Sequence, residues 1–311
     1  MMVRPKKGVA LMIVLVLLAA MASVAVSLSS GLQSQVMLAQ TQQDYQQALW
    51  YANGAENLAL NTLSRRQEHL YFGKNGGLEY VRYPVEQGSI QLLLNDLQTC
   101  FNVNVLATSE VTSGSPYREQ LVNLFTLLGV PASVANSLTE QIQIKVNGKM
   151  ASLPGEDVGG LPGTNFQMVD ISELRQLRNM DAALYKKVTP FLCTLPTTKL
   201  AINVNTLSPK KSALLAALFF PFLNAEQARS VLLKRPVKGW DSVDNFLDAL
   251  PASVNTQKIQ RIKPFLQVES NYLQLNTLVH MNTLNVNMQS LITRTGKDIW
   301  TITWHQTGEF Q

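Results

Sequence analysis

The chain has 311 residues, of which 46% are hydrophobic and 15% are charged, and its formal net charge is +5. This composition fits a globular protein with one apolar segment and excludes a disordered chain. Three of the 26 cations, Arg4, Lys6 and Lys7, precede the apolar segment, and without them 23 cations face 21 anions. The remaining net charge of +2 is too small to indicate nucleic-acid binding by overall charge.

Cysteine and histidine are rare in this chain. Two cysteines, Cys100 and Cys193, stand far apart, and the three histidines are scattered at His69, His280 and His305. No CxxC motif occurs, so the sequence does not predict a zinc site. If the body of the chain is exported, we expect the two cysteines to form a disulfide; the alternative is a pair of buried thiols.

An uncharged segment of twenty residues runs from Val9 to Leu28. As a helix with a rise of about 1.5 Å per residue, it would span about 30 Å, the thickness of a bilayer core. A cleavable signal peptide is the competing interpretation, because Ala20-Met21-Ala22 offers a small-x-small cleavage site.

The residues after this segment favour a helix that continues. No proline follows until Pro84, and the first anion is Asp44. Apolar side chains recur at spacings near three and four, as on one face of a helix. They are Leu32, Val36, Ala39, Tyr45, Leu49, Ala52, Ala59 and Leu63. The pattern predicts one helix of about fifty residues, apolar in its first half and amphipathic in its second.

The stretch Lys6-Lys7-Gly8 before this helix resembles the class III leader of type IV pilins and pseudopilins. The resemblance implies that residues 1–8 are removed by a prepilin peptidase. Cleavage would follow Gly8, and Val9 would become the methylated first residue of the mature chain.

Ile13 occupies the fifth mature position, where most members of that family carry glutamate. An unpaired carboxylate in lipid costs several kcal/mol. The resemblance implies that the family glutamate pairs with the N-terminal amine of a neighbouring subunit. A subunit at the end of a filament has no such amine to meet, so Ile13 suits that position.

Beyond the helix the sequence predicts strands, recognised by β-branched and aromatic residues between turn signals. Gly296-Lys297-Asp298 is a plausible hairpin turn between the last two of them. The expected strands cover residues 79–85, 89–98, 272–281, 283–295 and 299–309. We expect the helix and these strands to form one α+β unit from residues 9–98 and 268–311, with a helical domain inserted at 99–267.

The inserted region contains a duplication. FNVNVL at 101–106 matches INVNTL at 202–207, and VTPFL at 188–192 matches IKPFL at 262–266. Asp170 and Asp244 each stand twenty residues before the prolines of the closing motifs, Pro190 and Pro264, and are predicted to cap helices. One supersecondary unit used twice, at about 100–192 and 201–266, explains this spacing.

Paired short helices of this kind resemble helix-hairpin-helix modules, some of which grip DNA. A turn that holds phosphate needs glycines, so that consecutive N–H groups can approach the oxygens. Of the four candidate turns only the first has a glycine, Gly129. A membrane-anchored DNA-binding protein of the competence type is therefore the alternative interpretation, and a packing module is favoured.

Several segments together resemble the protein K family of type II secretion systems, the large minor pseudopilins. They include QALWYANGAENLAL (47–60), CFNVNVLA (100–107), DISELRQLRNMDAALYKKVTPFLC (170–193), RPVKGWDSVDNFL (235–247) and WHQTGE (304–309). The resemblance implies a pseudopilin fold with a long N-terminal helix and a small antiparallel sheet. It also implies a large helical insertion made of two helix-hairpin-helix-like repeats.

Members of that family usually bind calcium through two acidic clusters. Here Gln143 and Lys145 stand near where the first carboxylates are expected, and only Glu156 and Asp157 keep part of the second cluster. Calcium prefers six to eight oxygen ligands, several of them carboxylates. Calcium binding through Glu156 and Asp157 is thus an open alternative to two solvated loop acids.

No nucleophile elbow, HExxH or GxxxxGK motif is present, so we expect no enzymatic activity. The resemblance implies partners instead: minor pseudopilins I and J, the major pseudopilin, the prepilin peptidase and inner-membrane lipid, with no nucleic acid. It implies a single-pass inner-membrane protein with its body in the periplasm, at the tip of the pseudopilus. A minor pilin of a true type IV pilus is a weaker alternative, disfavoured by the repeat and by Ile13.

Overall fold

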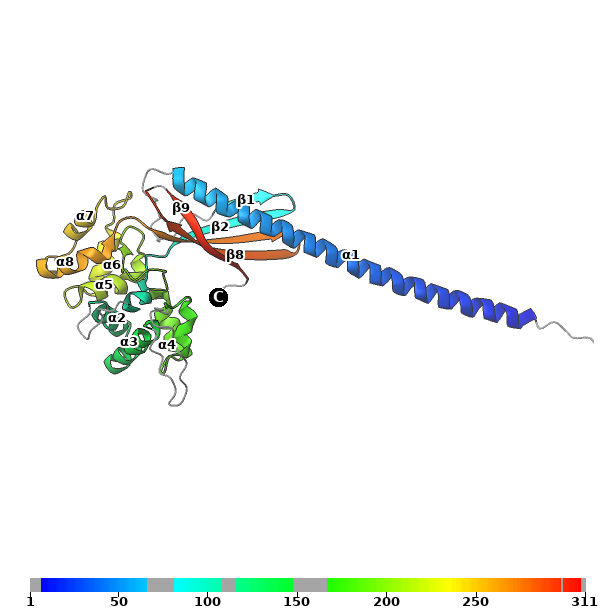
Figure 1. Cartoon of the computed structure of the whole chain (residues 1–311), viewed down its shortest axis with the longest axis horizontal. Coiled ribbons are helices and arrows are strands. Elements are labelled where there is room, and N and C mark those ends of the chain that lie inside the picture. Colours follow the sequence, from blue (N-terminus) through cyan, green and yellow to red (C-terminus); the bar gives the residue numbers. More distant parts are fainter. Residues whose placement is uncertain (1–6, 66–80, 108–115, 148–166, 298, 309–311) are drawn as a thin grey trace, which may run out of the picture.

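The computed structural model describes residues 7–65, 81–107, 116–147, 167–297 and 299–308. A long helix, α1, runs from Lys7 to Arg65 and forms a rod that projects far beyond a head of two lobes (Figure 1). Its 59 residues confirm the predicted continuous helix. No proline interrupts the ladder of hydrogen bonds, which explains why the helix extends past the apolar segment.

The first lobe of the head is a five-stranded antiparallel sheet, covered on one face by the second half of α1 (Figure 1). Its strand order is β1-β2-β7-β8-β9. The bounds are Val81–Val85 (β1), Gly88–Asp96 (β2), Tyr272–Met281 (β7), Leu284–Arg294 (β8) and Trp300–Thr307 (β9). The five predicted strands and the insertion between the second and third are therefore confirmed, as is the α+β fold class.

Small side chains let α1 approach this sheet closely. Ala48 and Ala52 are fully buried and Ala55 is nearly so, against Leu273 and Val279 of β7. Alanine adds no bulk at a helix–sheet contact and favours the helix itself. The core of this lobe is thus a helix of small residues on a sheet of large ones.

The second lobe is the helical insertion between β2 and β7. Its first half contains β3 (Phe101–Asn102), η1 (Val103–Ala107), α2 (Pro116–Leu127), α3 (Ala132–Val146), η2 (Ile171–Gln176), α4 (Ala182–Val188), η3 (Thr189–Phe191) and β4 (Leu192–Cys193). Its second half contains β5 (Ile202–Asn203), η4 (Pro209–Lys211), α5 (Ser212–Phe219), α6 (Ala225–Leu233), α7 (Val243–Asp248), α8 (Thr256–Ile262), η5 (Lys263–Phe265) and β6 (Leu266–Gln267). Both halves share one core, in which Phe101, Phe125, Phe219 and Phe246 are fully buried.

Each half begins and ends with a short strand, and the two strands pair in parallel. Phe101 pairs with Leu192 in the first half, and Ile202 pairs with Leu266 in the second. Pro190 and Pro264 lie in the 3-10 turns that end α4 and α8. Proline cannot continue an α-helix but is tolerated in the first turn of a new helical segment, where its missing N–H would have no partner.

One predicted cap is correct and the other is wrong. Asp170 caps η2, where its side chain accepts from the N–H of Ser172 and Glu173 bonds back to complete a capping box. In the second half Ser242, not Asp244, caps α7, and it accepts from the N–H of Asn245. Asp170 and Asp244 both stand twenty residues before a proline, but the loop between the paired helices is two residues longer in the second half. The actual cap of α7 therefore lies two residues further from its proline than Asp170 does. Asp244 lies within α7 and pairs with Lys263.

Candidate assembly surface and the cleft between the lobes

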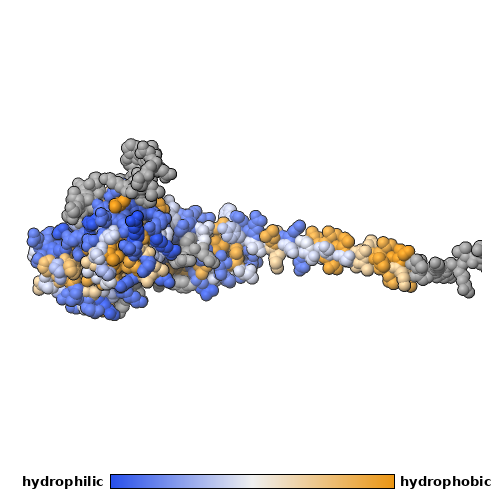
Figure 2. Space-filling model, turned by 90° about the horizontal axis from the view of Figure 1, so that it is seen from below, coloured by the Kyte–Doolittle hydropathy of each residue, from blue (hydrophilic) through white to orange (hydrophobic). Residues whose placement is uncertain are grey.

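The first half of α1 is an exposed apolar rod. Its large side chains from Leu11 to Leu38 contact no other part of the described chain, and Ile13 is 55% exposed. Figure 2 shows this hydrophobic surface on the rod, whereas the head is mostly hydrophilic. α1 is the one helix among the described residues that is long and apolar enough to cross a membrane. A continuous apolar surface of this size indicates contact with lipid or with other proteins.

The predicted processing residues lie at the start of this rod. Gly8 and Val9 fall within the first turns of α1, and their side chains lie outside the described residues. Residues 1–6, which belong to the predicted leader at 1–8, also lie outside them. Gly8, Val9 and Ile13 thus all lie within the first two turns of α1, and their predicted roles in processing and assembly stay predictions.

A buried carboxylate joins the second half of α1 to strands β8 and β9 of the sheet. Glu56 is 5% exposed, accepts a hydrogen bond from Ser290 Oγ at 2.5 Å, and lies 3.0 Å from His305 Nδ1. Ser290 belongs to β8 and His305 to β9. Because a buried carboxylate requires partners, this cluster fixes how β9 lies against α1.

The two cysteines are joined. Cys100 and Cys193 form a disulfide with a Cα–Cα distance of 5.8 Å. The bond links the start of the first repeat to its end, beside the parallel pair of β3 and β4. A crosslink at that point closes the first repeat into a covalent loop.

A second buried carboxylate lies where the chain passes between the lobes. Asp96, the last residue of β2, accepts from the N–H of Gln98 at 2.7 Å and from Asn203 Nδ2 at 3.0 Å, and also from the hydroxyls of Thr206 and Ser270. Burial raises the pKa of Asp96 above its ordinary value, and these hydrogen bonds act in the opposite direction. The cluster ties the end of β2 to both ends of the second repeat.

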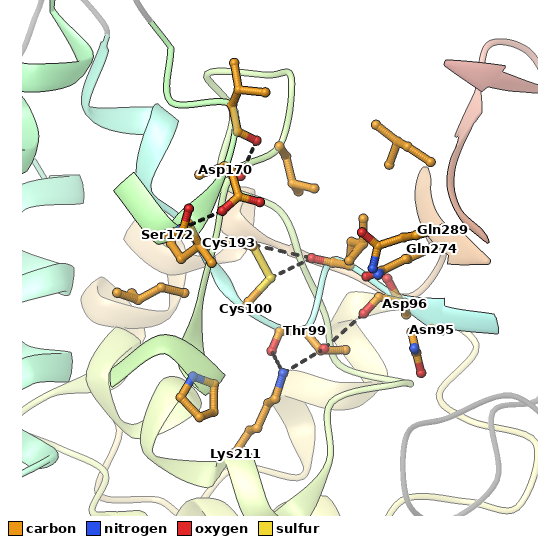
Figure 3. A pocket seen from close by; sticks show the side chains of 18 of the residues that line it. Asn95, Asp96, Thr99, Cys100, Asp170, Ser172, Cys193, Lys211, Gln274 and Gln289 are labelled. Atoms are coloured by element: carbon orange, nitrogen blue, oxygen red, sulfur yellow. Dashed lines mark hydrogen bonds between the residues drawn. A yellow bond between two sulfur atoms is a disulfide. The ribbon is translucent and has the colours of Figure 1, made fainter. Parts of the chain in front are cut away.

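Beside this junction a cleft of about 700 Å³ separates the sheet from the helical lobe (Figure 3). The sheet supplies its face opposite α1, with Gln274, Gln289 and Trp304. The helical lobe supplies Asp170 and Arg175, and the disulfide lies between the two walls. Its lining mixes apolar and uncharged polar side chains with four charged ones, Asp96, Asp170, Arg175 and Lys211.

Two asparagines that the sequence analysis did not single out organise the repeats. Asn104 accepts from the N–H of Met168 at 2.8 Å and donates to its carbonyl at 2.9 Å. Asn205 makes the same pair of bonds to Trp240, at 2.7 and 2.9 Å. Each clamped residue stands two positions before a helix cap, so the second asparagine of each NVN motif positions the following helix pair. The repeated NVN pattern was the available signal.

The turn that could hold phosphate uses its N–H groups internally. Gly129, between α2 and α3, has a φ of +75°, and its N–H donates to the carbonyl of Thr126 at 2.9 Å. The N–H of Val130 donates to the carbonyl of Phe125 at 3.0 Å. These bonds complete the end of α2.

The structure describes only part of the region that was considered for calcium binding. Glu156 and Asp157 lie outside the described residues. Within the described ranges no group of three or more His, Cys, Asp or Glu side chains gathers at a metal-binding distance. Lys145, near the expected first cluster, pairs with Glu173 at 3.2 Å. A cation at this place does not fit a calcium shell.

The fold and the exposed apolar helix define a class of protein, the pilin-like subunits, in which a hydrophobic helix continues into an α+β head. Family models described as type II secretion system, protein K match residues 99–197 and 202–269. The chain therefore belongs to the protein K family of type II secretion systems.

Relatives support this over nearly the full length. The protein named type II secretion system protein K from Klebsiella pneumoniae is 33% identical, and that from Aeromonas hydrophila is 30% identical, with 94% and 95% of each chain covered. A solved structure, the GspK-GspI-GspJ complex from the enterotoxigenic Escherichia coli type 2 secretion system, contains a similar chain. The similarity has a TM-score of 0.73 at 36% identity and covers 87% of this chain and 99% of that one.

Proposed function

We propose that this protein is the minor pseudopilin at the tip of the type II secretion pseudopilus. There it binds minor pseudopilins I and J, primes assembly and limits the length of the fibre for export of folded proteins. The observation that carries the proposal is the pairing of an exposed apolar helix with a head that is widened by a second lobe. The similarity to the chain in a complex with GspI and GspJ supports it.

Assembly begins with the apolar half of α1. Anchored in the inner membrane as a single span, with the head in the periplasm, it is available to the prepilin peptidase. Cleavage after Gly8 exposes Val9 for methylation. The same surface then leaves the lipid and packs against the helices of I, J and the major pseudopilin. Because those helices are equally apolar, close packing and shape complementarity decide the association.

Ile13 limits this protein to the end of the stack. In subunits within the fibre a carboxylate at this place would meet an amine of the subunit above. Isoleucine places no charge in the membrane and needs no partner. A subunit without such a requirement fits the position with nothing above it.

The helical lobe supports the same position. It is attached at the junction formed by Asp96 and lies to one side of the sheet (Figure 1). A subunit of the shaft is surrounded by copies on all sides, and a second lobe of this size would collide with them. The role is structural, and it requires neither catalysis nor calcium.

Immunogold electron microscopy tests the proposal. An epitope tag at the C-terminus of the full chain should label the ends of isolated pseudopili, and the chain should co-purify from membranes with I and J. Labelling distributed along the shaft would contradict the proposal, as would a failure to recover I and J under any detergent condition.

A further inference from the structure

The two edges of the sheet differ in how they are protected. The edge strand β1 carries Arg82 and Pro84 within its five residues. The opposite edge, β9, reads WTITWHQT and contains no proline and no Lys, Arg, Asp or Glu across eight residues. Edge strands without such groups offer a template for a further strand, and proteins normally protect them. β9 is the open edge of this sheet.

The register identifies which backbone groups of β9 point away from the sheet. The N–H of Gly308 donates to the carbonyl of Asn287 at 3.1 Å, and the N–H of Thr295 donates to the carbonyl of Ile299 at 2.9 Å. Because hydrogen-bonded pairs alternate along antiparallel strands, the backbone of Thr301, Trp304 and Gln306 faces β8.

The backbone of the intervening residues of β9 faces outward. Trp300, Ile302, His305 and Thr307 lie opposite β8 residues in non-hydrogen-bonded pairs. Their N–H and C=O groups therefore point away from β8, and in the part of the chain that the structure describes no further strand pairs with β9. They form a row of unused donors and acceptors at a sheet edge.

This edge is held in place and has room beside it. His305 is bonded to Glu56 of α1, so β9 is fixed before any partner arrives. Trp304 and Gln306 belong to the other face of the sheet and line the cleft between the lobes. Gln274 and Gln289 line the same cleft (Figure 3). Alternate side chains of an added strand would point toward that cleft. A fixed backbone edge with space for side chains is the arrangement used in strand addition.

We propose that β9 accepts a strand from a neighbouring minor pseudopilin, which becomes the sixth strand of the sheet. This rests on the proposed function. The contact between Glu56 and His305 joins β9 to α1, the helix along which neighbouring subunits assemble in the proposed function. An uncharged edge selects an uncharged, extended segment. A single copy at the tip offers no second β9 for pairing.

Hydrogen exchange of single amides tests this in the full chain in detergent, alone and with co-purified I and J. The outward amides of Ile302, His305 and Thr307 should exchange about tenfold more slowly in the complex. The amides of Trp304 and Gln306 already bond to β8 and serve as internal controls that should change little.

Charge at the edge provides a second test. Thr303→Lys combined with Thr307→Lys should weaken recovery of the complex about tenfold. The matched variant Tyr83→Lys on β1 should leave recovery unchanged.

A complex with I and J whose outward β9 amides exchange as in the free chain would overturn the inference and leave the proposed function intact. Protection that rises with the concentration of the chain alone would instead indicate a second copy. Protection that appears only on adding an exported protein would indicate cargo, and either result would also overturn it. Failure of wild-type chain to form any complex would count against the proposed function itself.

Discussion

The two halves of α1 form one uninterrupted helix but meet different surroundings. The second half buries Ala48, Ala52 and Leu63 against the chain's own sheet. The first half exposes side chains such as Leu28, at 63%, and Ile13. Both halves are helical, so they differ in which side chains they carry and in what covers those side chains.

This contrast explains how one element serves two purposes. The buried half needs a face of small residues that fits one sheet, and Glu56 fixes its orientation through Ser290 and His305. The exposed half carries no charged residue from Val9 to Leu28 and is long and apolar enough to cross a membrane. The chain's own sheet covers one face of the second half of α1, whereas the first half needs lipid or other proteins to cover its apolar side chains.

The largest expected effect comes from the same substitution in the two halves. Leu63→Ala should lower the free energy of unfolding of the head by about 2–5 kcal/mol, because it leaves a cavity between α1 and the sheet. Leu28→Ala should change it by less than about 0.5 kcal/mol. Chemical denaturation of the full chain in detergent measures both values. Equal losses would mean that the first half also packs against the head.

The next effect compares the two lobes. Cys100→Ser with Cys193→Ser should lower the stability of the helical lobe by about 2–4 kcal/mol, since the crosslink restricts the unfolded first repeat. The α1–sheet lobe has no cysteine and should keep its hydrogen-exchange protection. Reduction of the wild-type protein is the control and should reproduce the loss. An unchanged helical lobe would show that the disulfide does not form or does not contribute.

A smaller effect concerns the junction between the lobes. Because burial raises the folded-state pKa of Asp96 above its ordinary value of 3.8, the folded protein holds this proton more tightly than the unfolded chain. Its contribution to stability is fully present below pH 3.8 and is lost as pH rises through the folded-state pKa. The stability difference between wild type and Asp96→Asn should decline over that range. A difference independent of pH would show that the pKa is unchanged.

Much of the fold could be predicted because its signals are local or repeated. The absence of proline indicated the long helix, and β-branched residues between turns indicated the five strands. The matching motifs around Phe101 and Ile202 indicated the repeat, since similar sequences form similar units. The error at Asp244 came from counting residues across a loop whose length differs between the halves.

The parts that escaped prediction depend on contacts between distant residues. Asp96 meets Asn203, 107 residues away, and Glu56 meets His305, 249 residues away. No local pattern marks either carboxylate as buried. The sequence WTITWHQT lacks proline and Lys, Arg, Asp or Glu, but this identifies an unprotected edge only once the strand order has placed β9 at the edge of the sheet.

The intact mass of the protein extracted from membranes that contain the prepilin peptidase tests the central claim most directly. We expect a chain that begins at Val9 and carries one added methyl group, with the whole apolar half of α1 retained. A chain that begins after Ala22 would contradict this, because it would have lost most of the exposed half of α1 as a signal peptide.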